Sequence, residues 1–336
     1  MSFPVASRSK DGDAGPYKMQ VPESLDELAE HPEREPQFIA PALGTLQVNL
    51  LPWLYDRPIV GFDTGFHMMC YIARQITPFD TMRIISYNVN GIRAAMKKGL
   101  VDWMGTDPAD VICLQETKAV PGDVDPAPFR AMGYEPYWFS AQKKGYSGVA
   151  VFTRIPPDKV EYGNGHGPSD DEGRVIQLDF GDIRLINAYF PSGTSGEERQ
   201  DFKYQWLDEF GSWLQQLRKR KPRLILCGDY NIAHREIDIH DPKGNKRSSG
   251  FLPEEREWLT RFLDSGWIDT FRVFHTEPHR YSWWSQRFPS VRINNKGWRI
   301  DYITVTESLK DRLRDADIFP DVKHSDHCPV FLELNP

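Results

Sequence analysis

The sequence predicts an α/β protein in which two β-sheets pack face to face and helices cover their outer sides. Two observations support this fold class. From residue 82 onward, short runs rich in Ile, Leu and Val recur between turn residues, a pattern typical of buried strands. Two longer segments between these runs carry apolar residues at helical spacing, with charged residues opposite. Many strands and few amphipathic helices in about 255 residues favour layered sheets over a helical bundle.

Eight strands are predicted in order along the chain, because each segment is a short run rich in β-branched, aromatic or other apolar residues. They cover residues 83–89, 110–116, 147–154, 174–180, 183–190, 223–231, 299–306 and 329–334. The alternation of these strands with helical segments indicates one folded unit that begins near residue 82.

Two helices are predicted between these strands. In the first, which lies between residues 193 and 223, apolar residues recur at three- and four-residue spacing: Trp206, Phe210, Trp213, Leu214 and Leu217. We interpret this stripe as core packing and not as a cofactor site. The second helix, within residues 252–266, starts after a Pro, has acidic residues in its first turn and ends at Gly266.

Composition excludes a membrane-spanning protein and a disulfide-rich one. The chain is 40% hydrophobic and 26% charged, and none of its apolar runs approaches the roughly 18 residues that span a bilayer. Its four cysteines show no CxxC spacing, so neither a disulfide framework nor a zinc site is expected. Cys113 and Cys227 lie inside apolar runs, which predicts buried thiols in a reducing compartment. We therefore expect a cytoplasmic protein, associated with the nucleoid if its source is bacterial.

Residues 1–81 differ from the rest of the chain. They hold 6 Lys and Arg against 11 Asp and Glu, and they show little apolar periodicity. One interpretation is a poorly ordered N-terminal extension. The other is that the start of the gene was placed too early and Met82 is the true first residue. We favour the second, assign residues 1–81 no chemistry, and expect residues 82–336 to form the catalytic domain.

Charge is unevenly distributed along the chain. The net charge of the whole chain is −7, whereas residues 82–336 carry 35 basic and 37 acidic side chains. Local basic clusters occur at residues 96–99, 142–145, 218–221 and 242–247. The cluster at 218–221 is best explained as the solvated end of a helix. The Gly- and Asn-containing loop at 242–247 is the better candidate for a phosphate contact.

Polar residues lie at or beside one end of six of the predicted strands. These residues are Asn88, Asn90, Glu116, Asn187, Tyr189, Asp229, Asn231, Asp301, Asp326 and His327. A single carboxylate at a strand end is ordinary turn chemistry. Six strands that share this feature instead predict an acidic, amide-lined pocket with one histidine. Such a pocket suits metal-assisted phosphate-ester hydrolysis, because Mg²⁺ prefers oxygen ligands.

The order and spacing of these motifs resemble the exonuclease III family of abasic-site endonucleases, within the endonuclease/exonuclease/phosphatase superfamily. The resemblance spans residues 82–336 and rests on SYNVNGIRA, LQETK, GYSGVAVFTR, NAYFPSG, GDYNIAHREIDIHDPKGNKRSSGF, GWRIDY and SDHCP. It implies a four-layered α/β sandwich of two mainly antiparallel sheets flanked by helices. It also implies Mg²⁺-dependent cleavage of the phosphodiester 5′ to an abasic site, with Mn²⁺ as a substitute metal.

The resemblance assigns metal ligands. Glu116 is expected to be the main ligand, and Asn90 and Asp326 to complete the metal environment directly or through water. Asn88 is grouped with these residues.

Catalytic roles are implied in the same way. Asp229 would orient or deprotonate the attacking water, and Asn231 would donate to the developing phosphorane. His327, paired with Asp301, would remain cationic and contact the scissile phosphate.

Tyr189 and Asn187 are expected beside the phosphate. Tyr189 would be a hydrogen-bond donor, or a proton-transfer group if its pKa is depressed. An aromatic residue that only packs in the interface is the alternative for Tyr189. Ser192 stands where many relatives carry a longer amide, so the chain departs from the family pattern at one phosphate contact.

Contacts with double-stranded DNA are also implied. The matching positions are Arg93, Lys118, Gly145, Tyr146 and Asn245 for the backbone, and Trp283, Trp298 and Ile300 for an apolar pocket that admits a baseless sugar. Arg287 or Phe288 is a candidate for a residue wedged into the duplex. The expected partner is DNA with abasic sites or blocked 3′ ends, bound by a monomer.

Three functions remain open from the residues alone. The first is an abasic endonuclease that also has 3′→5′ exonuclease and 3′-phosphatase or phosphodiesterase activity. The second is a phosphoesterase of the same superfamily that acts on a lipid or inositol phosphate. The third is a DNA-binding relative without activity, which is disfavoured because every catalytic position holds a competent residue.

Overall fold

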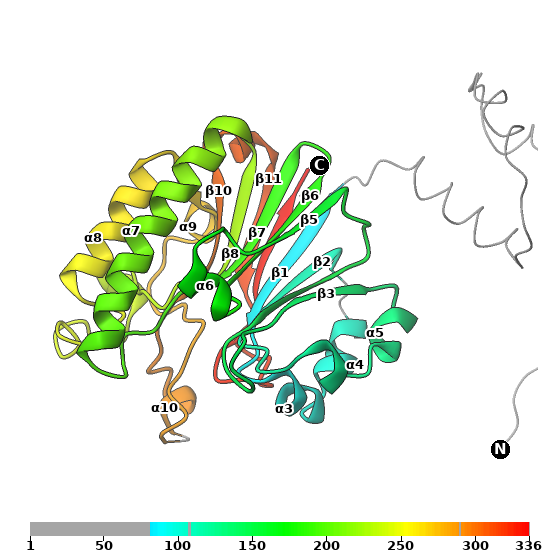
Figure 1. Ribbon diagram of the computed structural model, residues 1–336. Coiled ribbons are helices and arrows are strands. Elements are labelled where there is room, and N and C mark those ends of the chain that lie inside the picture. The colour runs from blue at the N-terminus through cyan, green and yellow to red at the C-terminus, as the bar shows by residue number, and fades with distance from the viewer. Residues whose placement is uncertain (1–80, 107–108, 289, 336) are drawn as a thin grey trace, which may run out of the picture. The chain divides into compact units, whose positions relative to one another are not determined.

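The computed structural model describes residues 81–335 except 107–108 and 289. Apart from residue 81, the predicted N-terminal extension, residues 1–81, therefore lies outside the described residues, as does Cys70. The described residues form two six-stranded sheets that face each other (Figure 1).

The first sheet has the strand order β11 (Leu313–Ile318), β12 (Val330–Leu334), β1 (Met82–Asn88), β2 (Val111–Gln115), β4 (Val149–Thr153) and β3 (Glu135–Phe139). The second has the order β5 (Lys159–Tyr162), β6 (Val175–Phe180), β7 (Ile183–Tyr189), β8 (Leu224–Asp229), β10 (Asp301–Thr306) and β9 (Trp267–Asp269). In each sheet one central pair is parallel, β1 with β2 and β7 with β8. The other neighbouring pairs are antiparallel. The prediction of mainly antiparallel sheets is confirmed.

Helices cover the outer face of each sheet and complete the four layers (Figure 1). Helices α3 (Ile92–Lys97), α4 (Leu100–Thr106) and α5 (Ala127–Ala131) pack on the first sheet. The long helices α7 (Glu197–Arg220) and α8 (Pro253–Asp264) pack on the second. The shorter elements are α6 (Gly167–Asp171), α9 (Thr270–Phe274), α10 (Ser290–Ile293), η3 (Pro121–Asp123), η4 (Glu236–Asp238) and η5 (Glu307–Arg312). In the described part of the chain, no helix combines the length and apolarity of a membrane span.

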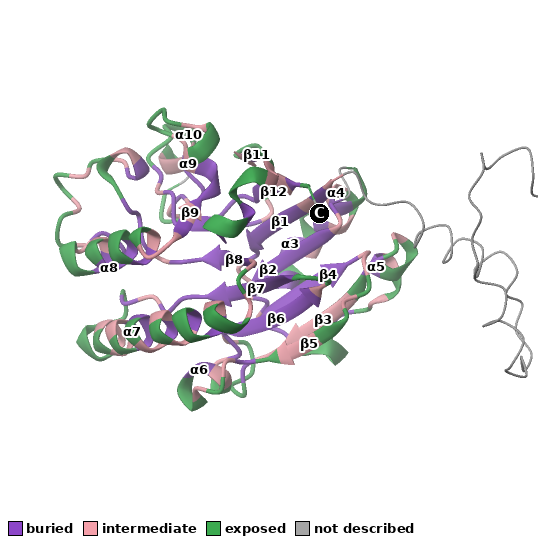
Figure 2. Ribbon diagram, turned by 90° about the horizontal axis from the view of Figure 1, so that it is seen from above, coloured by how far each residue is buried: buried purple, intermediate pink, exposed green. Residues whose placement is uncertain are grey.

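The strands alternate between two buried faces. In β1, Ile84 faces the other sheet, whereas Ile85 faces the helices. Burial on both sides explains why the central strands read as continuous apolar runs, and each fully buried aliphatic side chain contributes roughly 1.5–3 kcal/mol. Figure 2 shows the buried strands between helices whose outer sides are exposed.

The predicted helical stripe is core packing. Trp206, Phe210, Leu214 and Leu217 of α7 are buried against the second sheet, and Trp213 packs beside them half-buried. The buried thiols of Cys113 and Cys227, also predicted, lie between the two sheets.

The space between the sheets becomes more polar toward one edge. Beyond the apolar core, the Gln115 amide donates to Ser86 Oγ at 3.0 Å and to Asn187 Oδ1 at 2.7 Å. These three side chains come from strands of both sheets and are fully buried. They form a polar layer that ends the hydrophobic core, and the predicted site residues lie beyond it.

Candidate active site

The strand order explains why the predicted site residues meet. The carboxyl ends of the parallel strands β1 and β2, and of β7 and β8, lie at the same edge of the sandwich. Strand β10 runs antiparallel to β8, so its first residue, Asp301, pairs with the last residue of β8, Asp229. Tyr189 pairs with Asp229 across β7 and β8. We call this edge the rim.

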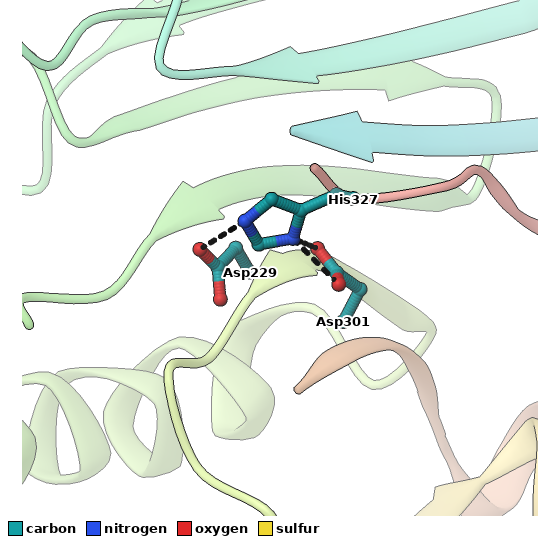
Figure 3. Close-up of side chains that lie close together, drawn as sticks. All are labelled: Asp229, Asp301 and His327. Atoms are coloured by element: carbon teal, nitrogen blue, oxygen red, sulfur yellow. Dashed lines mark hydrogen bonds and ion pairs between the residues drawn. The ribbon is translucent and has the colours of Figure 1, made fainter. Parts of the chain in front are cut away.

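His327 and Asp301 form the buried pair that the sequence predicts (Figure 3). His327 Nδ1 lies 2.9 Å and 3.1 Å from the two carboxylate oxygens of Asp301. Ser282 Oγ donates to Asp301 Oδ2 at 2.6 Å. Burial lowers the pKa of His327, but the charge and hydrogen bond of Asp301 outweigh it and raise the pKa to about 10. The imidazole is therefore a cation at neutral pH.

Asp229 lies on the other side of the imidazole, with Oδ2 3.9 Å from His327 Nε2 (Figure 3). Three donors converge on its carboxylate: Asn88 Nδ2 at 2.9 Å, the Asn231 backbone N–H at 2.8 Å and Asn231 Nδ2 at 3.1 Å. Burial and the negative charge of Asp301 raise the pKa of Asp229 to about 7, although His327 opposes them. This carboxylate can therefore exchange a proton near neutral pH.

Glu116 follows β2 and is half-buried at the rim. Its Oε1 accepts hydrogen bonds from Tyr189 OH at 2.7 Å and Asn88 Nδ2 at 3.1 Å. Its Oε2 lies 2.8 Å from Lys118 Nζ, which also donates to Asn90 Oδ1. Burial opposes ionisation, but Lys118 and these donors hold the pKa of Glu116 below its usual value. A positive charge thus bridges two of the oxygens predicted to bind metal.

Asp326 is joined to the same cluster. Asn90 Nδ2 donates to its Oδ1 at 2.9 Å, and Trp283 Nε1 donates to its Oδ2 at 3.1 Å. Burial opposes ionisation of Asp326, but the His327 cation and these donors lower its pKa. Glu116, Asn90 and Asp326 therefore supply oxygens of the kind that Mg²⁺ prefers.

The rim holds the backbone in unusual conformations. Asn90, Glu116 and Asn231 have φ of 45°, 49° and 52°, in the left-handed region that residues other than glycine rarely adopt. Such strain persists only where the surroundings fix the chain, and it is concentrated at functional sites.

Tyr189 and Asn187 occupy different positions on β7. Burial and the charges of Glu116 and Asp229 raise the pKa of Tyr189, so its hydroxyl stays protonated and donates to Glu116. Asn187 lies below the rim in the polar layer, where Nδ2 donates to the backbone carbonyls of Leu114 and Ala150. Its amide is fully occupied, so the structure places Asn187 away from the position beside the phosphate that we expected.

An apolar cluster, which we call the wall, lies next to the imidazole. A backbone β-bridge joins Trp283 and Trp298, and their ring centroids lie 5.9 Å apart in an edge-to-face arrangement. They pack with Ile300, as predicted, and with Phe251 and Ile239, which the sequence did not point to. Trp283 is also bridged to His327. The ring centroids of Trp283 and His327 lie 6.4 Å apart, so the wall adjoins the buried histidine.

The predicted DNA contacts divide into exposed and internally bonded residues. Arg93 and Gly145 are exposed, and Lys118 is half-buried at the rim. Tyr146 is half-buried, and its hydroxyl accepts a hydrogen bond from Arg199 at 3.2 Å. The Asn245 amide donates to backbone carbonyls of its own loop.

Two further predicted positions lie in exposed or half-exposed segments. Phe288 is 59% exposed, and the Arg287 guanidinium lies over its ring. Ser192 is half-buried, with its hydroxyl 3.0 Å from that of Thr194.

Several residues that support the rim were missed by the sequence interpretation. Ser282 orients Asp301, and Arg292 donates to the carbonyls of Pro320, Val322 and Ser325, just before Asp326. Fully buried Arg174 donates to the Tyr189 carbonyl at 2.8 Å. None of these residues lies in a motif that carries the family resemblance, and their partners are distant along the chain, so no local signal pointed to them.

Two parts of the rim could attract a cation. Among the described residues, one group of at least three His, Cys, Asp or Glu side chains is close enough to share an ion: Asp229, Asp301 and His327, within 4.8 Å. The imidazolium of His327, however, has no free lone pair to offer a metal. The cluster of Glu116, Asn90 and Asp326 offers oxygens and is already bridged by an ammonium group. It is the better match for a hard divalent cation.

Comparison with known proteins agrees with this geometry. Residues 85–327 match the model of the Endonuclease/Exonuclease/phosphatase family. An exodeoxyribonuclease of Bacillus subtilis is 48% identical over 256 residues, which cover 76% of this chain and 100% of that protein. The DNA repair nuclease APEX1 of Danio rerio is 41% identical, over 75% of this chain and 82% of that protein.

The chain is also similar to solved structures. An AP endonuclease from Archaeoglobus fulgidus superposes with a TM-score of 0.69 at 30% identity, over 75% of this chain and 98% of that one. A 3′ phosphatase from Neisseria, bound to a product DNA hairpin, gives 0.70 at 28% identity, over 76% and 100%.

Proposed function

The chain belongs to the endonuclease/exonuclease/phosphatase family, in its exonuclease III branch of abasic-site endonucleases, and we propose that it is a DNA-repair nuclease that hydrolyses the phosphodiester 5′ to an abasic site. One observation carries this proposal. The buried Asp301–His327 pair, the proton-accepting Asp229 and an acidic oxygen cluster meet beside a wall of tryptophans. The catalytic domain is residues 82–336.

Mg²⁺ is the proposed metal, with Mn²⁺ as a substitute. Glu116, Asn90 and Asp326 would hold it, and Asn88 would fix Glu116 through its amide. The ion would supply charge for the phosphate oxygens and the leaving group. Lys118 would have to release Glu116 as the ion binds.

Asp229 accepts the proton of the attacking water. Its pKa near 7 suits this task, and the donors from Asn88 and Asn231 fix its carboxylate. Asn231 Nδ2 donates to Asp229 Oδ2 at 3.1 Å and to the Phe190 carbonyl at 3.0 Å, so it would exchange one of these two bonds to donate to the phosphorane. The His327 cation contacts the phosphate and offsets the growing negative charge.

Tyr189 acts as a hydrogen-bond donor and not as a base, because its pKa is raised. Asn187 would have an indirect role. Its amide joins β7 to β2 and β4 by hydrogen bonds and so fixes the strand that carries Tyr189.

The DNA duplex is the proposed partner, and the protein would act on it as a monomer. Arg93, Lys118, Gly145, Tyr146 and Asn245 would hold the backbone, which fixes register without reading sequence. Trp283, Trp298 and Ile300 would receive the baseless sugar. Because one pocket can process several 3′ ends, 3′→5′ exonuclease and 3′-phosphatase or phosphodiesterase activities are also proposed.

Incision of a duplex with a single tetrahydrofuran residue tests this proposal. We expect cleavage 5′ to the tetrahydrofuran in Mg²⁺, its loss in EDTA, and its recovery when Mg²⁺ or Mn²⁺ is added in excess. Denaturing gel electrophoresis measures the product. An inositol polyphosphate serves as the control substrate. Hydrolysis of that compound without incision of the duplex would point to the second phosphoesterase class instead.

Replacing Trp298 with alanine is expected to lower kcat/KM for the tetrahydrofuran duplex about 10- to 100-fold. The change opens the apolar wall, and a binding pocket of this kind gives discrimination of about 1–3 kcal/mol. The kcat/KM for a duplex with a normal nucleotide should fall less, so the ratio of kcat/KM between the tetrahydrofuran duplex and the normal duplex decreases. Trp138→Ala on β3 is the matched control, because that ring packs on Phe152 on the helix-covered side of the first sheet. Equal losses in both variants would contradict the assignment of the pocket.

A further inference from the structure

A lysine and a glutamate form a fully buried ion pair between the two long helices. Lys203 of α7 and Glu255 of α8 both have 0% exposed side chains, and Nζ lies 2.6 Å from Oε1. Burial lowers the pKa of Lys203, opposed by the carboxylates of Glu255 and Asp229. Removing two charges from water is costly, and such pairs are often no more stabilising than apolar residues of similar size. The role of the pair is therefore indicated by the other hydrogen bonds that Lys203 and Glu255 make.

Lys203 reaches the turn that carries Asn231. Its ammonium donates to the Asn231 backbone carbonyl at 2.8 Å. Asn231 has φ of 52°, and its own N–H donates to Asp229 Oδ1 at 2.8 Å. The strained residue is thus held at its N–H by the proposed base and at its carbonyl by Lys203. Without Lys203, the carbonyl would lose its charged donor and the left-handed turn would lose one of its fixed points.

Glu255 holds a second segment. Its Oε2 accepts hydrogen bonds from the backbone N–H groups of Gly250 at 2.6 Å and Leu252 at 3.0 Å. This segment directly follows the basic loop at 242–247. A Cβ on Gly250 would lie 3.0 Å from the Asn231 carbonyl oxygen and 3.2 Å from the Trp298 ring. Gly250 therefore lies between the catalytic turn and the pocket wall.

We propose that the Lys203–Glu255 pair is a positioning unit that fixes the Asn231 turn and the segment 249–252 against each other. The unit sets where the Asn231 amide points relative to the wall that receives the baseless sugar. Neither residue touches substrate. The inference rests on the proposed function, because it explains how the Asn231 amide is kept in position for the transition state of that reaction.

The test is the double substitution Lys203→Met with Glu255→Gln. It removes both charges and keeps an acceptor for Gly250 and Leu252, so the protein has no buried unpaired charge that would prevent folding. We expect kcat for the tetrahydrofuran duplex to fall about 10- to 100-fold with KM unchanged, since small displacements at a reacting centre cost up to about 100-fold. Hydrogen–deuterium exchange should increase in residues 229–233 and 249–252.

Arg184→Met is the matched control. Arg184 is a buried cation on β7 that pairs with Asp179 at 2.6 Å, and it touches neither the Asn231 turn nor the segment 249–252. This variant should lose thermal stability but keep kcat and the exchange of both segments. The inference is overturned if the folded double variant keeps wild-type kcat, or if Arg184→Met loses kcat equally.

The two proposals fail in different ways. A wild-type protein that does not incise the duplex would refute the proposed function. Hydrogen–deuterium exchange in residues 229–233 and 249–252 would still show whether Lys203 and Glu255 fix these two segments. Incision by the wild type together with unchanged exchange in the double variant would refute the positioning unit alone.

Discussion

Replacing Asp229 with asparagine is expected to lower kcat for incision about 10³-fold at nearly unchanged KM, the size of effect typical of a lost general base. Asparagine has the same shape, so the segment can keep its fold, but it cannot accept the proton of water. The free enzyme should show an acidic limb in its rate profile, because activity requires the ionised form of a carboxyl group whose pKa is about 7. A bound divalent cation favours the ionised form, so the limb should lie at pH 7 or below.

Single-turnover incision between pH 5 and 9 measures both effects. The variant should lose the acidic limb as well as the rate. Asp179→Asn is the control, because Asp179 is also a buried strand carboxylate yet binds Arg184 and Lys221 at the opposite end of the sheet. An Asp229→Asn enzyme with wild-type kcat would assign the proton acceptor elsewhere.

The interior of the fold was predictable from sequence, whereas its edges were not. All eight predicted strands are present, and each has neighbours on both sides in its sheet. The missed strands β3, β5, β9 and β11 are the four edge strands. Edge strands are partly solvated, as in β11 (Leu313–Ile318), where charged and apolar residues are mixed. Their pattern then lacks the continuous apolar run that marks a strand covered on both faces.

The rim was predictable for a related reason. A carboxylate or amide that ends a buried strand must find a polar partner, and strand ends of this topology converge. Asn187 shows the limit of that argument. It precedes Tyr189 by two residues and so shares its face of β7, but it lies one layer deeper. The sequence reveals the shared face, whereas the depth at which the core ends depends on the opposing sheet.

Supporting contacts could not be predicted from local pattern. Lys203 lies on the buried face of α7 with Trp206 and Phe210, so helical spacing indicates its position. It does not reveal the carboxylate of Glu255 and the carbonyl of Asn231, which make the burial of a lysine possible. Ser282 similarly acquires a role only through Asp301. Both depend on partners between 19 and 52 residues away along the chain.

Replacing Asp301 with asparagine is expected to reduce incision at pH 8 about 10²- to 10³-fold, the cost of losing one preorganised charge contact in a buried site. The reason is the protonation state of His327. In the wild type, Asp301 overcomes the effect of burial and holds the pKa of His327 near 10. With a neutral amide in its place, the largest effect that opposes burial is lost and the pKa of His327 falls, although the carboxylates of Asp229 and Asp326 still raise it. A larger fraction of the imidazole is then neutral at pH 8.

The pH profile separates this cause from a loss of structure. The alkaline limb of the wild-type rate should lie near pH 10, and that of Asp301→Asn should be shifted to lower pH, so that acidification restores part of the activity. The tetrahydrofuran duplex suits this range because it lacks the aldehyde that makes a natural abasic site alkali-labile. Ser282→Ala is the control. It removes a donor to Asp301 but keeps the carboxylate charge, so its rate should fall while its alkaline limb stays in place.

Stability provides a second, independent measure of the same pair. The pKa of His327 is raised in the folded state, so the stability that the charged pair contributes is complete below the unfolded-state pKa of about 6.5. It is lost progressively as pH rises toward 10. The difference in Tm between wild type and Asp301→Asn should therefore be largest near pH 6 and shrink steadily toward pH 10. A difference that does not change with pH would mean that Asp301 holds His327 by hydrogen bonding and not by charge, and an imidazolium would no longer account for binding of the phosphate.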